Sequence, residues 1–468
     1  MKIINLSKNT IYIEDIDKHI PYDNKEIIFT DNELKKSRCL RNFIISEHCK
    51  VITYENTQIQ NSILFLKNKR KIEAPKEEKP EQIIEENLEV NKDLEVKIHG
   101  IFYDASGYAK VNRNLALELN NLGIKVKVDP KNSVNQLKES ELAPIVKLTN
   151  TSISKKHILI DSIIPTFAEA SSGKYKILYT TIESYSIPDQ FLESCALYNE
   201  IWLTSEWSAS ILRKYMPDKI INVVVPGINE NLYSNTGTKM DFGSQVNKFI
   251  FLSVFSWSYR KGYDVLLNAY MDEFSSKDDV SLIIMSRYQS GRSRYEKNKI
   301  KEDIDKIMLS YPNKDLPQVV RLGKVLDETD MPKLYRACNA YVSLTRGEGI
   351  GLTPLEASMC GLPVVMTNCS GQQEYLRQNN SYCLEIDKIE KIKQGEMHIH
   401  YWDNQEFPYL KTKEFHNRAR KALRELYNNY IEAKEKNKKL QELIMNRFTW
   451  KNTAKTALTR LQEIYKTL

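Results

Sequence analysis

Most of the chain alternates between short apolar runs and longer stretches whose apolar residues recur at helical spacing. The stretch after residue 107 shows the helical pattern, with Val111, Leu115 and Leu119 apolar before Gly123 ends it. Runs typical of buried strands lie at residues 96–99, 124–128, 157–161, 176–180, 249–255, 282–285, 341–344 and 362–366. Because buried parallel strands alternate with helices in this way, the pattern predicts an α/β fold.

Both ends of the chain depart from this alternation. Residues 1–74 hold short β-like segments separated by polar turns, which predicts a small β-rich N-terminal domain. Residues 75–95 are highly charged and lack glycine and aromatic residues, which is typical of an extended linker. The final part, from residue 412, is rich in Lys, Glu, Leu and Ala and predicts a helical tail that ends in a helix at 446–468.

Length and composition exclude several classes of protein. A chain of 468 residues is too long for one core, and a net charge of +7 does not by itself indicate nucleic-acid binding. The seven cysteines include no CxxC pair, which argues against a zinc site or a disulfide framework and favours a reducing cytoplasm. His398 and His400 could share a strand face, but no third ligand is evident, so we expect no metal.

The densest candidate chemistry follows the strand at 341–344. Gly347, Gly349 and Gly351 form a tight turn that carries Glu348, and glycines let the backbone approach a ligand closely. Thr353 is the predicted N-cap of the next helix, with Pro354 at its first position. Free N–H groups and the positive end of a helix dipole would then face a ligand, most often a phosphate.

Glu348 and Glu356 form a Glu-x7-Glu pair, and this segment resembles the signature of retaining glycosyltransferases of the GT-B fold, of the family 4 type. The resemblance implies that Glu348 contacts the transferred sugar and Glu356 holds the nucleotide ribose. It also implies that the diphosphate binds the backbone of Gly349, Ile350, Gly351, Leu352 and Thr353. One alternative stays open for Glu356, because Thr353-Pro-Leu-Glu356 also fits a capping box.

A second element lies about ninety residues upstream, where Arg260-Lys261-Gly262 follows the strand at 249–255. The leaving diphosphate gains negative charge as the sugar bond breaks, and two fixed cations stabilise it most at that moment. The alternative is a solvated basic turn. The strand and turn at 319–325, with Gly323, resemble the part of these enzymes that surrounds the base.

The first α/β half gives weaker signals. Gly107 lies in a loop that resembles the glycine loop facing the reaction centre in these enzymes, although an ordinary tight turn fits as well. Glu183 lies where relatives contact the acceptor, or it caps a helix. Pro226 is followed directly by Gly227, so the histidine found between them in many family members is missing here.

Together these features predict a GT-B fold with two facing Rossmann-like domains. The expected parts are a β-rich domain at 1–74, a linker at 75–95, an acceptor-side domain at 96–240, a donor-side domain at 241–445 and a crossing helix at 446–468. The resemblance implies a UDP- or GDP-linked sugar donor, a glycan or protein acceptor and no cofactor or metal. A DNA acceptor, an inactive scaffold, and an N-terminal domain that docks to an assembly partner or a membrane surface stay open alternatives.

Overall fold

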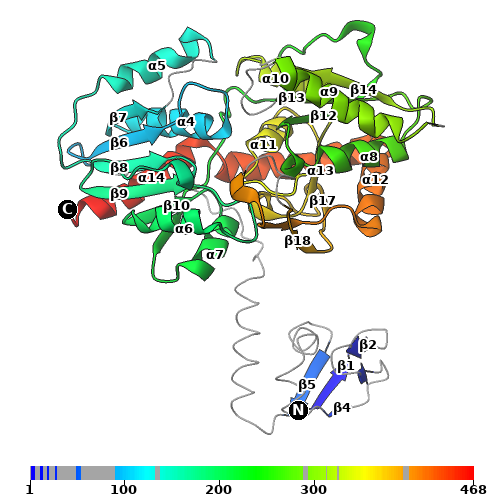
Figure 1. Ribbon diagram of the computed structural model, residues 1–468, viewed down its shortest axis with the longest axis horizontal. Helices are drawn as coiled ribbons and strands as arrows, with labels where there is room; N and C mark the ends of the chain where they lie inside the picture. The colour runs from blue at the N-terminus through cyan, green and yellow to red at the C-terminus, as the bar shows by residue number, and fades with distance from the viewer. Residues whose placement is uncertain are drawn as a thin grey trace. The chain divides into compact units, whose positions relative to one another are not determined.

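The computed structural model describes residues 90–468, except 132–136, 288–293, 313, 324–325 and 394–399, together with five strands within the first 53 residues (Figure 1). The chain divides into two compact units, Met1–Asn87 and Leu88–Leu468. Most of the predicted linker at 75–95 lies outside the described residues. Among the described helices, none combines the length and the apolar character needed to cross a bilayer.

The first unit is rich in β-strands, as the sequence predicts. A three-stranded antiparallel sheet has the order β4-β1-β5, and β2 and β3 pair separately as a hairpin. The strands are β1 (Lys2–Asn5), β2 (Ile11–Ile13), β3 (Lys18–Ile20), β4 (Ile27–Ile28) and β5 (Cys49–Thr53).

The second unit begins with a six-stranded parallel sheet of order β11-β10-β9-β8-β6-β7. β8 and β10 are buried along their whole length, which explains why each holds three consecutive apolar residues, 158–160 and 201–203, rather than alternating ones. The strands are β6 (Glu95–Gly100), β7 (Lys125–Pro130), β8 (Ile158–Ser162), β9 (Tyr175–Thr180), β10 (Glu200–Leu203) and β11 (Ile220–Val223). The helices are α4 (Gly107–Asn121), α5 (Glu139–Thr149), α6 (Asp189–Ala196) and α7 (Glu206–Tyr215). We call this part the first lobe.

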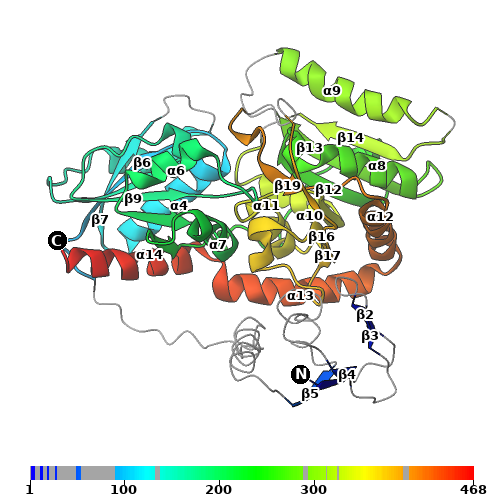
Figure 2. The ribbon, with the colours of Figure 1, turned by 60° about the horizontal axis from the view of Figure 1, so that its bottom comes forward.

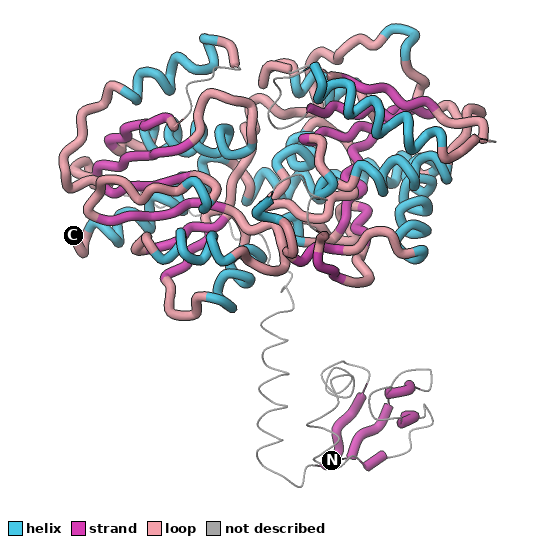
Figure 3. The backbone as a smooth tube through the Cα atoms, viewed as in Figure 1, coloured by secondary structure: helices cyan, strands magenta, loops and turns pink. Residues whose placement is uncertain are grey.

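A second parallel sheet has the order β14-β13-β12-β15-β16-β17, and Figure 3 shows the strands of both sheets in magenta. Its strands are β12 (Phe249–Ser256), β13 (Val280–Arg287), β14 (Gln318–Leu322), β15 (Ala340–Ser343), β16 (Val364–Thr367) and β17 (Tyr382–Leu384). Its helices are α8 (Tyr263–Glu273), α9 (Arg294–Leu309), α10 (Met331–Ala337), α11 (Leu352–Met359), α12 (Lys413–Asn428) and α13 (Tyr430–Arg447). We call this part the second lobe. Two such lobes make the GT-B fold.

The strand order of the second sheet determines where the Arg260-Lys261 turn and the glycine turn lie. The chain runs outward from β12 through β13 to β14 and then returns to β15, so the order of the sheet reverses between β12 and β15. Ligands of open α/β sheets bind at the carboxyl ends of strands beside such a reversal. The Arg260-Lys261 turn follows β12 and the glycine turn follows β15. The topology therefore brings together two motifs that lie about ninety residues apart.

The end of the chain returns to the first lobe. α14 (Trp450–Tyr465) continues directly from α13, and Figure 2 shows the two helices in succession along the two lobes. Its apolar face packs into the core of the first lobe through Trp450, Ala454, Ala457, Leu458, Leu461 and Ile464. Where the chain crosses, the Ile228 N–H donates to the Phe448 carbonyl at 2.8 Å, and the Trp450 N–H donates to the Ile228 carbonyl at 3.3 Å.

Candidate active site

A cleft of about 460 Å³ lies between the two lobes at the carboxyl ends of both sheets. Nearly all of the candidate residues from the sequence line it: Gly107, Glu183, Arg260, Lys261, Glu348, Gly349, Ile350, Gly351, Leu352, Thr353 and Glu356. Gly323 does not. It is exposed and follows β14, the edge strand of its sheet, whereas Leu326 and Glu328, a few residues further along the chain, do line the cleft.

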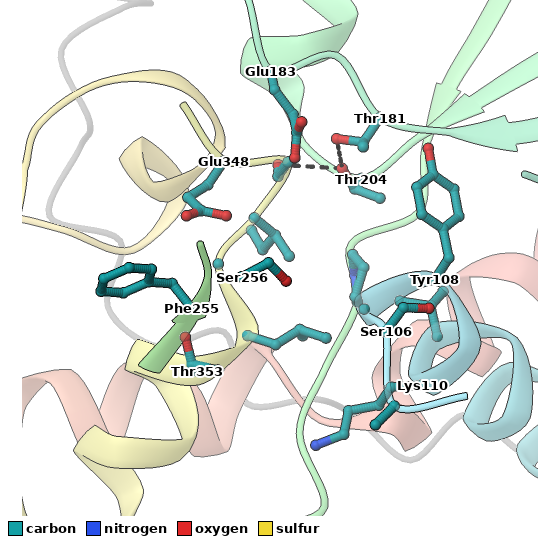
Figure 4. Close-up of a pocket in the computed structure, with 18 of the residues that line it drawn as sticks. Ser106, Tyr108, Lys110, Thr181, Glu183, Thr204, Phe255, Ser256, Glu348 and Thr353 are labelled. Atoms are coloured by element: carbon teal, nitrogen blue, oxygen red, sulfur yellow. Dashed lines mark hydrogen bonds between the residues drawn. The ribbon is translucent and has the colours of Figure 1, made fainter. Parts of the chain in front are cut away.

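The centre of the cleft holds a network of ion pairs. The Lys261 ammonium donates to both carboxylate oxygens of Glu348, at 2.6 Å each. One guanidinium nitrogen of Arg260 lies 3.0 Å from Glu183 Oε1 and 3.9 Å from Glu348 Oε2, and it also donates to the Gly347 carbonyl. Glu183 comes from the first lobe and Glu348 from the second, and both line the cleft (Figure 4).

Burial and charge shift these groups in opposite directions. Burial alone would raise the pKa of Glu348, but Lys261 and Arg260 outweigh it and hold that pKa below its ordinary value. Burial raises the pKa of Glu183 despite the opposing charges of Arg260 and Lys261. Burial and the charge of Arg260 together lower the pKa of Lys261 against the pull of Glu348. The charged form of Lys261 is therefore less stable than usual, and an additional anion beside the ammonium would stabilise that charge.

The glycine turn opens α11 in a different way from the predicted one. Thr353 is not the N-cap, because α11 begins at Leu352 and Gly351 caps it with φ of +79°, a conformation that favours glycine. The Thr353 hydroxyl instead lies 2.7 Å from the Tyr341 hydroxyl. Gly351 has no side chain that could cap the helix, so the backbone N–H groups of Leu352 and Thr353, which line the cleft, are available to an anionic ligand.

Gly347 and Gly349 allow a close approach of the glycine turn to the first lobe. A Cβ on Gly349 would lie 2.0 Å from Thr181 Oγ1, and one on Gly347 would lie 2.2 Å from the Glu183 carbonyl oxygen. The Thr204 hydroxyl donates to the Gly349 carbonyl at 3.2 Å (Figure 4). The turn therefore contributes to the contact between the lobes, which the sequence did not predict.

Glu356 does not form the capping box that remained an alternative. Its Oε1 accepts from the Lys110 ammonium at 2.5 Å and its Oε2 accepts from the Tyr335 hydroxyl at 2.9 Å. Lys110 also lies 3.1 Å from Glu328 and donates to the Tyr233 hydroxyl at 3.0 Å. Sequence reasoning missed Lys110. Its one signal is its position in the first turn of the helix that follows the glycine loop.

The structure places the two first-lobe candidates, Gly107 and Glu183, on the wall of the cleft. Gly107 is the first residue of α4, Ser106 caps that helix through the Ala109 N–H at 3.2 Å, and a Cβ on Gly107 would meet nothing within 4 Å. Glu183 faces Arg260 and caps no helix.

His398 lies outside the described residues, and His400 begins a 3-10 helix, η6 (His400–Trp402), rather than a strand. Over the described part of the chain, His, Cys, Asp and Glu side chains form no group of three that could hold a metal ion.

Comparison with known proteins finds a family match within the second lobe. Residues 246–395 match the family model described as Glycosyl transferases group 1. LpsB of Rhizobium meliloti (strain 1021), a lipopolysaccharide core biosynthesis mannosyltransferase, is 29% identical over 116 residues, which are 25% of this chain and 30% of that protein. Mannosylfructose-phosphate synthase of Agrobacterium fabrum (strain C58 / ATCC 33970) is 26% identical over 157 residues, 32% of this chain and 33% of that protein. The chain thus spans about a third of each relative.

Solved structures extend the likeness to both lobes. HepE of Anabaena in complex with UDP-glucose superposes with a TM-score of 0.55 at 13% identity, covering 80% of this chain and 100% of that one. Sucrose-phosphate synthase from Thermosynechococcus elongatus gives 0.57 at 14% identity with the same coverage. At such identities the likeness shows the fold, so the GT-B architecture predicted from the sequence is confirmed.

Proposed function

We propose that this protein is a retaining glycosyltransferase of the family 4 type, which moves a sugar from a nucleoside-diphosphate sugar to an acceptor hydroxyl. The observation that carries the proposal is the network of Arg260, Lys261 and Glu348 beside the uncapped N-terminus of α11. A buried cluster of this kind contributes little to folding, because desolvation of its charges offsets their attraction. Its cations and free N–H groups match the chemistry of a diphosphate leaving group.

In this proposal the diphosphate binds at the first turn of α11 and draws Lys261 and Arg260 toward itself. Without donor, both cations are paired with carboxylates, Lys261 with Glu348 and Arg260 with Glu183. As the sugar bond breaks, negative charge grows on the diphosphate and each cation gains a stronger partner there. The gain is largest in the transition state, which is the condition for catalysis.

Glu348 orients the sugar and Glu356 accepts hydrogen bonds from the ribose. The base extends toward the end of β13, where Ser286 lines the cleft and its buried hydroxyl has no hydrogen-bond partner among the described residues. An unsatisfied buried hydroxyl of this kind fits a polar edge of a ligand. Ser286 thus takes the role that the sequence assigned to the neighbourhood of Gly323. The donor is UDP- or GDP-linked.

The transfer forms a bond between the acceptor oxygen and the anomeric carbon while the bond from that carbon to the diphosphate oxygen breaks. The bonding electrons leave with the diphosphate, which also takes the proton of the acceptor hydroxyl. Attack on the same face retains configuration. A double displacement would need an enzymic nucleophile, whereas this proposal gives Glu348 the role of orienting the sugar. The reaction needs no metal in this proposal.

The test is a calorimetric titration with UDP-, GDP-, ADP- and dTDP-linked sugars, with and without chelator. We expect chelator-insensitive binding of one donor, its loss in Glu356→Ala, and its retention in Glu435→Ala, which removes a glutamate whose side chain is 61% exposed, outside the cleft. Absence of binding to every donor would refute the proposal and favour the inactive scaffold.

A further inference from the structure

One wall of the cleft is built by a segment that follows the second sheet in sequence but packs against the first lobe. The hairpin of β18 (Ile389–Lys391) and β19 (Glu406–Pro408) carries η6 between its strands. The Tyr185 N–H donates to the Glu406 carbonyl at 2.8 Å, and the Glu406 N–H donates to the Ser186 hydroxyl at 2.9 Å. These bonds fix the hairpin to the loop that carries Glu183.

Aromatic packing holds η6 of this hairpin in place. Trp402 is buried in one cluster with Phe191 and Phe407 and lines the cleft. The ring of Tyr401 is only partly buried, also lines the cleft, and lies 5.4 Å from the Phe191 ring and 4.9 Å from the Trp402 ring between centroids. Tyr401 is thus a fixed aromatic surface on the cleft wall.

Tyr401 and Tyr108 both lie near enough to Glu183 to feel its charge. Burial, and then the charge of Glu183, raise the pKa of Tyr401 to about 12. The charge of Glu183 likewise acts on Tyr108, whose hydroxyl lies 2.9 Å from the Thr180 hydroxyl. This side of the cleft therefore combines one carboxylate, phenol hydroxyls and aromatic faces.

The charge of the cleft differs from that of the whole chain, which is net positive. Every cation among the described lining residues is already engaged: Lys261 with Glu348, Arg260 with Glu183, Lys110 with Glu356 and Glu328, and Arg113 with the carbonyls of Phe102 and Asp104. Five lining carboxylates face these four cations: Asp104, Glu183, Glu328, Glu348 and Glu356. A bound diphosphate adds further negative charge, so an anionic acceptor would be repelled.

We propose that the acceptor is an uncharged saccharide that binds between Glu183 and Tyr401. One acceptor hydroxyl donates to Glu183, and the C–H face of the sugar ring packs on the negative face of the Tyr401 ring. This inference rests on the proposed transferase function and adds the acceptor class. Nucleic acid and phosphate-bearing acceptors are disfavoured because the lining carboxylates and the bound diphosphate repel their negative charge. A peptide acceptor is disfavoured because the site offers an aromatic surface of the size of a sugar ring.

The experiment uses the full chain and the donor found by calorimetry. Acceptors are the methyl glycosides of glucose, mannose and galactose, the 6-phosphates of these sugars, a Ser/Thr peptide and a single-stranded oligonucleotide. We expect transfer to at least one neutral glycoside, with kcat/KM at least about tenfold lower for its 6-phosphate. An equal or better 6-phosphate, or transfer to the peptide or oligonucleotide alone, would overturn the inference. Donor binding without transfer to any glycoside would overturn it too and would leave the donor half of the proposed function intact.

Substitutions of Tyr401 test whether the acceptor binds against this ring. Tyr401→Ala should raise the acceptor KM at least about tenfold with a smaller change in kcat, and Tyr401→Phe, which keeps the ring, should restore most of the affinity. The matched control is Tyr409→Ala, because Tyr409 follows the same hairpin, is also partly buried and does not line the cleft. Equal acceptor KM values for Tyr401→Ala and Tyr409→Ala would remove Tyr401 from the acceptor site.

Discussion

The ammonium of Lys110 lies 2.5 Å from the carboxylate of Glu356 and so joins the first helix of one lobe to the glycine-turn helix of the other. The Glu356 side chain is only 3% exposed, and a carboxylate so buried needs a charged partner or several hydrogen bonds. Lys110 supplies the charge and Tyr335 supplies a second hydrogen bond. The carboxylate that we assign to the ribose therefore holds the two lobes together when no donor is bound.

Replacement of Lys110 by methionine should destabilise the protein by on the order of 3 kcal/mol, because Glu356 is left as an uncompensated buried charge. Thermal denaturation measures the effect. Lys438→Met is the control, since its 2.7 Å pair with Glu435 is exposed on both sides and is worth under about 1 kcal/mol. Lys110→Met/Glu356→Gln should recover part of the loss. Equal stability of Lys110→Met and Lys438→Met would show that the link between the lobes contributes nothing.

Lys261→Ala and Glu348→Ala should each lower turnover at least about 10²-fold while the fold is retained, the scale expected for lost transition-state contacts. Steady-state rates of nucleoside-diphosphate release give the effect, and circular dichroism checks the fold. Lys261→Arg should recover only part of the rate, because a planar guanidinium cannot occupy the position of a compact ammonium between two carboxylate oxygens. A variant of either residue with near wild-type turnover would exclude that residue from catalysis.

Gly349→Ala should separate the lobes locally, because its Cβ would lie 2.0 Å from Thr181 Oγ1. We expect a lower melting temperature and a loss of activity. Gly107→Ala is the matched change on the facing wall, where a Cβ meets nothing within 4 Å and alanine favours the helix. It should leave stability unchanged or raise it by up to about 1 kcal/mol.

The activity of Gly107→Ala then decides between the two interpretations of that residue. An ordinary helix start tolerates the methyl group, whereas close approach to the donor or acceptor does not. A Gly349→Ala protein as stable and active as the wild type would show that the contact between the glycine turn and Thr181 opens without cost.

Affinity for the nucleotide sugar should rise as the pH falls through the pKa of Glu183. Burial raises that pKa above 4.5, so Glu183 takes up a proton while Glu348, whose pKa is lowered, stays ionised. Protonation ends the pairing of Glu183 with Arg260 and frees the guanidinium for the diphosphate. Calorimetry between roughly pH 5 and pH 8 should show this trend in the wild type. In Glu183→Gln, affinity should be high and independent of pH; a trend unchanged in that variant would assign the titration to another group.

Local patterns in the sequence were sufficient to predict the α/β lobes, the glycine turn and the Arg260-Lys261 turn. The apolar runs identified buried strands because strands covered on both faces tolerate few polar residues. The same local reasoning made Thr353 the N-cap, because threonine before proline is a common helix start. Gly351 takes that place because its positive φ turns the chain into α11 two residues earlier.

Contacts between distant segments could not be predicted from one sequence. Lys110 and Glu356 lie 246 positions apart, and nothing in the local sequence around either residue specifies the other. Tyr401 reaches the first lobe because a hairpin folds away from the second sheet. Gly323 was assigned to the cleft from a motif, but it follows an edge strand, and edge position depends on strand order.

The crossing of α14 has a consequence for how the protein is made. The core of the first lobe combines residues of β6 and α4 with Leu458 and Leu461, which are synthesised more than 300 residues later. On the ribosome, the first lobe therefore emerges early with one apolar face uncovered, while the second sheet and its helices complete their own core first. Chains stalled before residue 449 should expose that face to chaperones. Synthesis in this case runs opposite to the usual order, in which N-terminal domains fold first.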